Sequence, residues 1–537
     1  MQQSTHVPKA WLPIFALTLI SLVGLFLRWY RLDIISFRYD TAEAMFRARE
    51  IARGHLPLLG ITNSLGFRNP PGLPWAILPP LLVSASPQLA TAWFGLLCLS
   101  GIVPLYLICR CWLGDWSFVL PCTAYALLPN QVFADRTIWA QWLMIPIFTW
   151  VLWLLLSTLR PGRRSSATSA IVVLALTWYG IAVHLSGLAY LPIVIVAIVA
   201  AGRKAQWSLA VVARITTVGC LPLLMLVPSG LDYLNSRQHP IAKPAHVTKF
   251  ESLMPPPDAF GPRLKESLSG QFNLFANAVQ ADDILSLPEC PGVMLTRRLV
   301  QVADALLLVL AGTGIALCGL ALSRKHTHDI TESTLSKLLL SWIFLPTIAG
   351  CAALSRANGS YFAPAVPALL LMLAVGPARF AKKFPGFSSI GSIAGLLSGC
   401  IYPLFCLQLM GIISHTSFVI GQYYIPLKDQ METARQLAAH GVSVHRLVHL
   451  SGDWYQRPYD YLLSEVLHSP EVTEQPSWAV LEDKNLRLHQ PARAKFFHEK
   501  AQYTHGSVES ILFETPEAGR QFVNTYYDIP IEGKGID

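Results

Sequence analysis

Residues 11–57 read WLPIFALTLISLVGLFLRWYRLDIISFRYDTAEAMFRAREIARGHLP. The first twenty of them are almost all apolar, and about 20 such residues suffice to cross a bilayer. No small-residue cleavage site accompanies the run, so we interpret it as an anchor and not as a removed signal peptide. Two acids, Asp40 and Glu43, follow shortly after the run. The stretch therefore predicts a membrane span that leads into a charged helix outside the bilayer.

The composition extends this pattern to the whole chain. Of 537 residues, 53% are hydrophobic and 14% are charged, and the mean hydropathy is +0.44. Soluble domains carry about 25% charged residues. The net charge of +9 is mild for this length and indicates no nucleic-acid partner. The ten cysteines lie mostly in apolar runs and offer no disulfide framework. We therefore expect an all-α polytopic membrane protein in contact with the lipid bilayer.

Apolar runs of spanning length recur along the chain. We count eleven: 11–30, 88–109, 116–134, 139–159, 168–183, 185–201, 207–228, 299–322, 335–354, 361–378 and 388–415. Basic clusters follow every second span, beginning at Arg110, Arg160, Arg203, Arg324 and Arg379. A cytoplasmic N-terminus places all of these clusters in the cytoplasm, as the positive-inside rule requires. The pattern predicts a bacterial inner (plasma) membrane protein with an extracytoplasmic, periplasmic C-terminus.

Strict alternation leaves three long segments on the outer face: the loops 31–87 and 229–298 and the tail 421–537. Residues 1–420 form the predicted transmembrane domain. In the tail, strand-like runs at 444–450, 478–481 and 508–513 alternate with helical stretches near 428–440, 457–467 and 516–526. The tail is therefore predicted to be a small extramembrane α/β domain.

Asp40 and Glu43 open the helix of the first outer loop and admit two interpretations. Asp-x-x-Glu before a helical run is the capping-box pattern, with Asp40 at the N-cap and Glu43 at the third helical position. Negative charge in a first turn also suits the helix dipole. Alternatively, a carboxylate just outside a span can take a proton from an acceptor hydroxyl. The residues themselves leave both interpretations open.

The order of features in this loop resembles the GT-C superfamily of glycosyltransferases. A first span, an acidic entry to an amphipathic helix, a Pro-Pro pair and a short juxtamembrane helix follow one another, the pair within LGFRNPPGLPW (65–75). The similarity is closest to the protein O-mannosyltransferase-like branch, which includes the aminoarabinose transferases of lipid A. It implies that Asp40, supported by Glu43, is catalytic and that Arg68 and Asn69 line the donor site.

The chain departs from this family at two positions. Thr41 follows Asp40 where many members have a second acid, and Asn69 precedes the prolines where many have Lys or His. We expect Arg68 to replace the missing basic contact to the donor phosphate.

Three further stretches extend the resemblance: LLPNQVFADRTIWAQWLM (127–144), TWYGIAVHLSGLAYLP (177–192) and RANGSYFAPAVPALLL (356–371). The resemblance makes five of their residues candidates for donor or phosphate binding: Asp135, Arg136, His184, Arg356 and Tyr361. Each has a structural alternative. Arg136 can pair with Asp135, and His184 can be a buried core histidine. Arg356 can snorkel from a helix end, and Tyr361 can belong to the aromatic belt.

The resemblance implies an integral-membrane glycosyltransferase that uses a polyprenyl-phosphate-sugar donor at the outer face. Its acceptor would be a hydroxyl or similar group of a glycolipid, a polysaccharide or a protein. No metal-ligand spacing occurs, so no cofactor is firmly implied. A divalent ion shared by Asp40, Asp135 and a phosphate is an open alternative. A secondary transporter or flippase of a lipid-linked or anionic solute is the rival class, although the sequence lacks the repeated halves typical of transporters.

Overall fold

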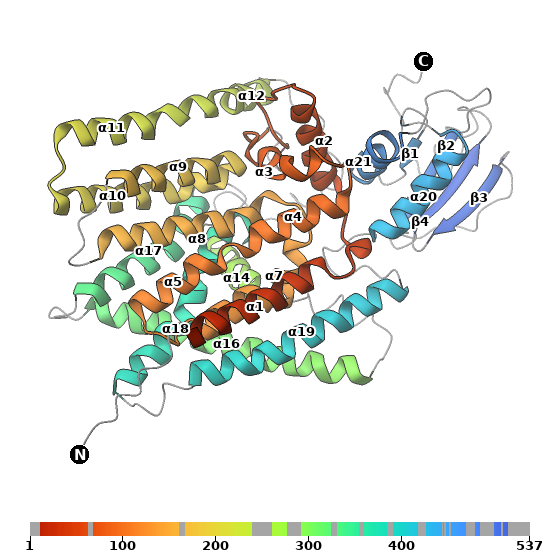
Figure 1. Cartoon of the computed structure of the whole chain (residues 1–537). Helices are drawn as coiled ribbons and strands as arrows, with labels where there is room; N and C mark the ends of the chain where they lie inside the picture. Colours follow the sequence, from red (N-terminus) through yellow and green to blue (C-terminus); the bar gives the residue numbers. More distant parts are fainter. Residues whose placement is uncertain are drawn as a thin grey trace.

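The computed structural model describes residues 11–62, 68–160, 167–238, 260–276, 291–323, 330–353, 359–383, 390–416, 426–442, 444, 447–449, 453–468, 478–483, 499–505 and 508–513. Long helices form most of this structure, and a four-stranded sheet lies at one end of it (Figure 1). Within the described ranges, the sheet is built from tail residues alone.

Before the tail, helices follow one another with short connections. Their bounds are α1 (Trp11–Trp29), α2 (Tyr39–Ala52), α3 (Gly72–Leu81), α4 (Pro87–Leu99), α5 (Ile102–Trp112), α6 (Val119–Leu127), α7 (Pro129–Asp135), α8 (Ala140–Leu159), α9 (Ala167–Val183), α10 (Leu191–Ala205), α11 (Leu209–Cys220), α12 (Val227–Gln238), α14 (Phe260–Ala276), α16 (Pro291–Ser323), α17 (Ile330–Ala353), α18 (Val366–Lys383) and α19 (Ile390–Thr416). Short 3₁₀ segments join some of them: η1 (Leu32–Ile34), η2 (Leu185–Tyr190), η3 (Leu221–Leu226) and η4 (Gly359–Ala365).

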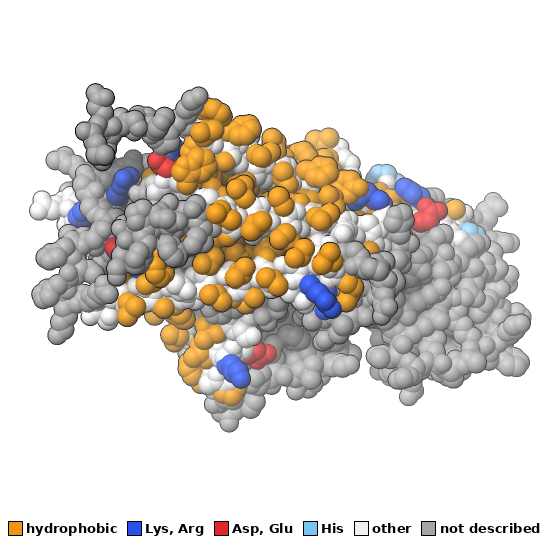
Figure 2. Space-filling view, turned by 90° about the horizontal axis from the view of Figure 1, so that it is seen from below, with side chains coloured by type: hydrophobic (Ala, Val, Ile, Leu, Met, Phe, Trp, Pro, Cys, Tyr) orange, Lys and Arg blue, Asp and Glu red, His pale blue; other side chains and the backbone are white. Residues whose placement is uncertain are grey.

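Eight of the described helical segments are long and apolar enough to cross a membrane, which makes the chain an integral membrane protein. They are Trp11–Trp29, Pro87–Trp112, Ala140–Leu159, Leu185–Ala205, Leu209–Asn235, Val293–Ser323, Tyr361–Phe380 and Gly391–Ser414. Their outward side chains are apolar: Leu22 in α1 is 59% exposed and Leu396 in α19 is 67% exposed. Figure 2 shows a face whose middle is covered by hydrophobic side chains, with most charged ones toward its ends. Such a surface suits hydrocarbon as its surroundings.

The other three predicted spans fall on helices outside this group of eight. α9 has 17 residues and α17 has 24, while the predicted span 116–134 is divided between α6 and α7. The division falls at Leu128, whose ψ of 126° is not helical, because a following proline disfavours the helical conformation. The count of eleven spans stays a prediction.

The first outer loop begins where α1 ends. Arg31 adopts a left-handed conformation (φ 53°), and η1 then leads to α2. α3 packs against α2, and its first residue lies against the end of α9. A Cβ atom on Gly72 would lie 2.5 Å from the backbone of Ala182 and Val183, so this close approach requires glycine. The Pro-Pro segment and the α9–η2 junction therefore meet at the end of the bundle that carries α2 (Figure 1).

The tail adds helices and a sheet. Its elements are α20 (Leu427–Ala439), β1 (Leu447–His449), α21 (Asp453–Tyr461), the π-helical turn η7 (Leu462–Val466), β2 (Trp478–Asp483), β3 (Glu499–His505) and β4 (Val508–Phe513). The sheet order is β1-β2-β4-β3, with β1 and β2 parallel and the other pairs antiparallel. α20 contacts η1 and α21 contacts α2, so the tail lies beside the first outer loop.

Most of these tail elements lie where the sequence predicts them. The predicted strand-like runs fall on β1, β2 and β4, and the first two helical stretches fall on α20 and on α21 with η7. β3 reads EKAQYTH, whose polar composition gives no strand signal. The predicted helix at 516–526 lies outside the described residues. That the tail folds as an independent domain stays a prediction.

Candidate active site

Asp40 is the second residue of α2, and the N-cap is Arg38. The capping-box interpretation, with Asp40 at the N-cap, is therefore wrong by two positions. The physical reason is that the helix starts earlier: Arg38 is extended, and its carbonyl already accepts a hydrogen bond from the Ala42 amide (2.8 Å). Asp40 keeps the favourable interaction of a first-turn acid with the helix dipole.

Asp40 differs from the other three acids between residues 31 and 87. Asp33, Glu43 and Glu50 each pair with an arginine, whereas the Asp40 carboxylate makes no hydrogen bond or ion pair with another described residue. Burial raises the pKa of Asp40 to about 6; the Arg38 charge opposes this rise and the Glu43 charge adds to it. An unpaired carboxylate with a pKa near neutrality suits a general base.

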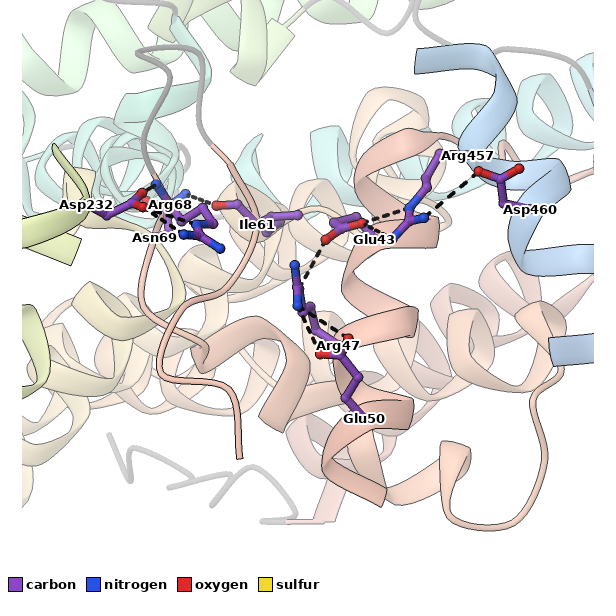
Figure 3. A network of polar contacts seen from close by, with 9 residues as sticks. All are labelled: Glu43, Arg47, Glu50, Ile61, Arg68, Asn69, Asp232, Arg457 and Asp460. Carbon is purple, nitrogen blue, oxygen red and sulfur yellow. Dashed lines mark hydrogen bonds and ion pairs between the residues drawn. The ribbon is translucent and has the colours of Figure 1, made fainter. Parts of the chain in front are cut away.

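Glu43 lies in a different environment (Figure 3). It is 7% exposed, and one of its oxygens accepts a hydrogen bond from Nε of Arg47 (3.1 Å). The other oxygen accepts one from Nε of Arg457 in α21 (2.8 Å). Both oxygens of Glu43, the residue predicted to support Asp40, are therefore hydrogen-bonded to guanidinium groups. The geometry favours Asp40 over Glu43 as the proton acceptor.

The start of α2 contacts the link between α7 and α8. The Thr41 hydroxyl donates a hydrogen bond to the Ile138 carbonyl (3.2 Å), and the Arg38 guanidinium lies over the Trp139 ring (5.4 Å). Gln141 follows two residues later, in the first turn of α8. This link therefore connects the turn that carries Asp40 with a second group of polar side chains.

That second group, the His184 cluster, consists of Asn69, Gln141, His184 and Tyr361. The rings of His184 and Tyr361 stack with centroids 5.4 Å apart, and Nε2 of His184 lies 3.3 Å from Nε2 of Gln141. Oδ1 of Asn69 accepts a hydrogen bond from the Leu185 amide (3.4 Å). The other terminal atom of the Gln141 amide is buried without a hydrogen-bond partner among the described residues. Three residues predicted to line the donor site, Asn69, His184 and Tyr361, are thus close together. Beside them lies the Gln141 amide atom that has no hydrogen-bond partner among the described residues.

Arg68, the neighbour of Asn69 in the chain, binds Asp232 of α12 (Figure 3). Its Nη2 lies 2.8 Å from Oδ1 of Asp232, and its backbone amide donates to Oδ2 (2.7 Å). The guanidinium side chain stays 41% exposed. A contact between Arg68 and a phosphate stays a prediction.

Asp135 and Arg136 are fully buried and hold the end of α1. Nη2 of Arg28 lies 2.5 Å from Oδ2 of Asp135, and Gln131 donates to Oδ1 (2.7 Å). The Arg136 guanidinium donates to backbone carbonyls where α1 ends and η1 begins, those of Leu27, Arg28, Tyr30 and Arg31. These contacts give both residues a structural role, and phosphate binding by them stays a prediction.

Two further expectations concern Arg356 and metal binding. Arg356 lies outside the described residues. In the part of the chain that the structure describes, no group of three or more His, Cys, Asp or Glu side chains could hold a metal ion. A metal shared by Asp40, Asp135 and a phosphate stays an untested alternative.

Residues of this region that sequence reasoning missed include Arg28, Gln141 and Arg457. Arg28 carried a usable signal, since an ionisable residue inside a span requires a partner. Gln141 is a polar residue in an otherwise apolar run, which is a weaker signal of the same kind. Arg457 carried none, because its partner Glu43 is 414 positions away in the chain.

The fold was compared with those of known proteins. No protein-family model and no curated protein sequence matches this chain. The chain is similar to the structure of ArnT from Cupriavidus metallidurans bound to undecaprenyl phosphate, with a TM-score of 0.50, 14% identity, and coverage of 94% of this chain and 98% of that chain. A second similar structure is the archaeal oligosaccharyltransferase AglB from Archaeoglobus fulgidus in complex with an inhibitory peptide and a dolichol-phosphate (TM-score 0.48, 12% identity, 86% of this chain and 61% of that chain). At this identity the similarity to ArnT shows the fold alone, and this fold is shared over nearly the whole length of both chains.

Proposed function

We propose that the protein is an integral-membrane glycosyltransferase that moves a sugar from a polyprenyl-phosphate-linked donor to an acceptor hydroxyl at the outer face of the membrane. The observation that carries this proposal is the Asp40 carboxylate in the first turn of α2, which has no hydrogen-bond or ion-pair partner among the described residues and whose pKa is raised to about 6. The fold shared with ArnT supports it, because that structure holds undecaprenyl phosphate, the chemical form that such a donor leaves behind.

Asp40 supplies the base that the reaction needs. The acceptor hydroxyl gives its proton to the Asp40 carboxylate as its oxygen attacks the anomeric carbon. The bond from that carbon to the phosphate oxygen breaks, and its electron pair leaves with the lipid phosphate. A one-step displacement of this kind inverts the anomeric centre.

The surrounding residues offer complementary contacts to the donor. Negative charge grows on the departing phosphate, and guanidinium groups stabilise such charge. We assign this role to Arg38 and Arg68, which lie at the same end of the bundle as Asp40. We assign the hydrogen bonding of sugar hydroxyls to Asn69 and to Gln141, whose Oε1 has no hydrogen-bond partner among the described residues.

The function is tested by mass spectrometry of envelope glycolipids and glycoproteins from cells with and without the active gene. One class of molecule should gain the mass of one sugar residue only when the gene is active. Purified protein should also bind undecaprenyl phosphate, measured by native mass spectrometry. Identical glycan profiles in the two strains would contradict the proposal.

A further inference from the structure

The tail contacts the chain on both sides of Asp40. Three contacts join the start of α20 to the residues just before α2: a β-bridge between Pro426 and Ser36, a hydrogen bond from the Leu427 amide to the Ile35 carbonyl (3.0 Å), and one from the Gln430 side chain to the Phe37 carbonyl (3.1 Å). The segment that enters α2 is therefore held by the tail.

After Asp40, the tail binds α2 through Arg457. Nε and Nη2 of Arg457 both lie 2.8 Å from the same oxygen of Glu43 (Figure 3). The Arg457 guanidinium also lies 4.1 Å from the centroid of the Phe46 ring. Glu43 is buried, and a buried carboxylate stays ionised only with such partners. Arg47 occupies the second oxygen, so the Glu43 charge is shared between its own helix and the tail.

A second contact of opposite polarity lies further along α2. Glu465 of η7 is 5% exposed and accepts hydrogen bonds from Arg49 (3.2 Å) and Arg53 (2.7 Å) of α2. Between the two ion pairs, the Tyr461 ring packs edge-on against Phe46 (5.0 Å between centroids). In one ion pair the acid belongs to α2 and the arginine to the tail, and in the other the acid belongs to the tail. This opposite polarity favours one orientation of the two segments.

We propose that Arg457 is a positioning residue: through Glu43 it holds the first turns of α2, and the extramembrane tail thereby fixes Asp40 for proton transfer. Asp40 and Glu43 are three residues apart and are therefore neighbours on the helix surface, so a displacement of one moves the other. This inference rests on the function proposed above for Asp40. It gives the tail a role in the chemistry without a tail residue touching the substrate.

The test compares Arg457→Met with the wild-type full-length protein in membranes of equal protein abundance. Methionine keeps an apolar contact with Phe46 and removes the charge. The rate of envelope modification should fall between about tenfold and about a hundredfold, the cost of a misplacement of about 1 Å. Binding of undecaprenyl phosphate by the purified protein should be unchanged, whereas a merely structural defect would lower both. Arg435→Met is the matched control, because Arg435 of α20 pairs with Glu432 on the exposed surface.

A double-mutant cycle separates positioning from other effects. In a Glu43→Gln background, Arg457→Met should cause little further loss, because the two residues act through one contact. The double variant has no buried carboxylate that would need Arg457 as a partner. It can therefore be measured even where Arg457→Met alone fails to accumulate. A wild-type rate for Arg457→Met, or fully additive losses in the cycle, would overturn the inference. A fully active Asp40→Asn variant would instead overturn the proposed function.

Discussion

Two aspartates seven positions apart in the first outer loop have opposite environments. A hydrogen bond from Arg31 lowers the pKa of Asp33, whereas burial raises the pKa of Asp40 to about 6. The sequence identified Asp40 as a candidate, but it could not distinguish the two environments, because the partners of each acid are set by the fold. The sequence also could not show the partners of Glu43. It predicts that Glu43 supports Asp40, whereas in the structure the Glu43 carboxylate forms ion pairs with Arg47 and Arg457.

The raised pKa of Asp40 predicts a pH dependence of transfer. The base works only when ionised, so the rate should rise with pH through about 6 and level off above about 7. At pH 5 the ionised fraction, and with it the rate, should be about tenfold below the plateau. Initial rates of envelope modification in isolated membranes, measured from pH 5 to pH 8, check this. A flat profile over that range would contradict the assignment of Asp40 as the base.

At the level of helices and strands, the sequence predicts those elements whose signal is local, such as a long apolar run. It does not predict elements that form only because a neighbouring segment pairs with them. Apolar run length predicted α1, α8 and α19, because hydrocarbon thickness sets the length of a span. The break between α6 and α7 followed from Pro129, which the hydropathy reading passed over. β3 has a polar sequence and forms because β4 pairs with it.

The contact of α3 with α9 predicts that Gly72 cannot be replaced. In Gly72→Ala, the new Cβ atom would lie 2.5 Å from the Ala182 backbone, so α3 must move and carry Asn69 away from Leu185. Membrane abundance and transfer should both fall, measured by immunoblotting and by mass spectrometry. Gly230→Ala in α12 is the control, because nothing lies within 4 Å of its added Cβ atom. Equal behaviour of the two variants would show that the close approach does not matter.

At the scale of the whole molecule, contacts between distant parts of the sequence bring the site together. Charge alternation predicts the side of each loop, and Asp40 and the C-terminal tail are predicted to share one side. The ion pairs of Glu43 and Glu465 place the tail against α2, which agrees with that prediction. Nothing in the sequence could pair residues more than 400 positions apart, so the role of the tail emerged from the structure alone.

This arrangement predicts an extracytoplasmic C-terminus. Alkaline phosphatase fused after Asp537 should be active in cells, since the enzyme folds only in the oxidising compartment. A green fluorescent protein fusion at the same point, exported through the general secretory route, should stay dark. Because the tail contacts α2, the same fusions report the side on which Asp40 works. A bright fluorescent fusion with an inactive phosphatase would place Asp40 in the cytoplasm.

The Asp40→Asn variant tests whether the Asp40 carboxylate takes the proton of the acceptor hydroxyl. Asparagine has nearly the same size, and the Asp40 side chain makes no hydrogen bond or ion pair with the residues that the structure describes, so folding and abundance should stay normal. The rate of sugar transfer to the envelope, measured by mass spectrometry at equal abundance, should fall by about 10²–10⁴. Asp33→Asn, in the same loop, should keep the wild-type rate. A well-folded Asp40→Asn protein with an undiminished rate would show that Asp40 is not the base.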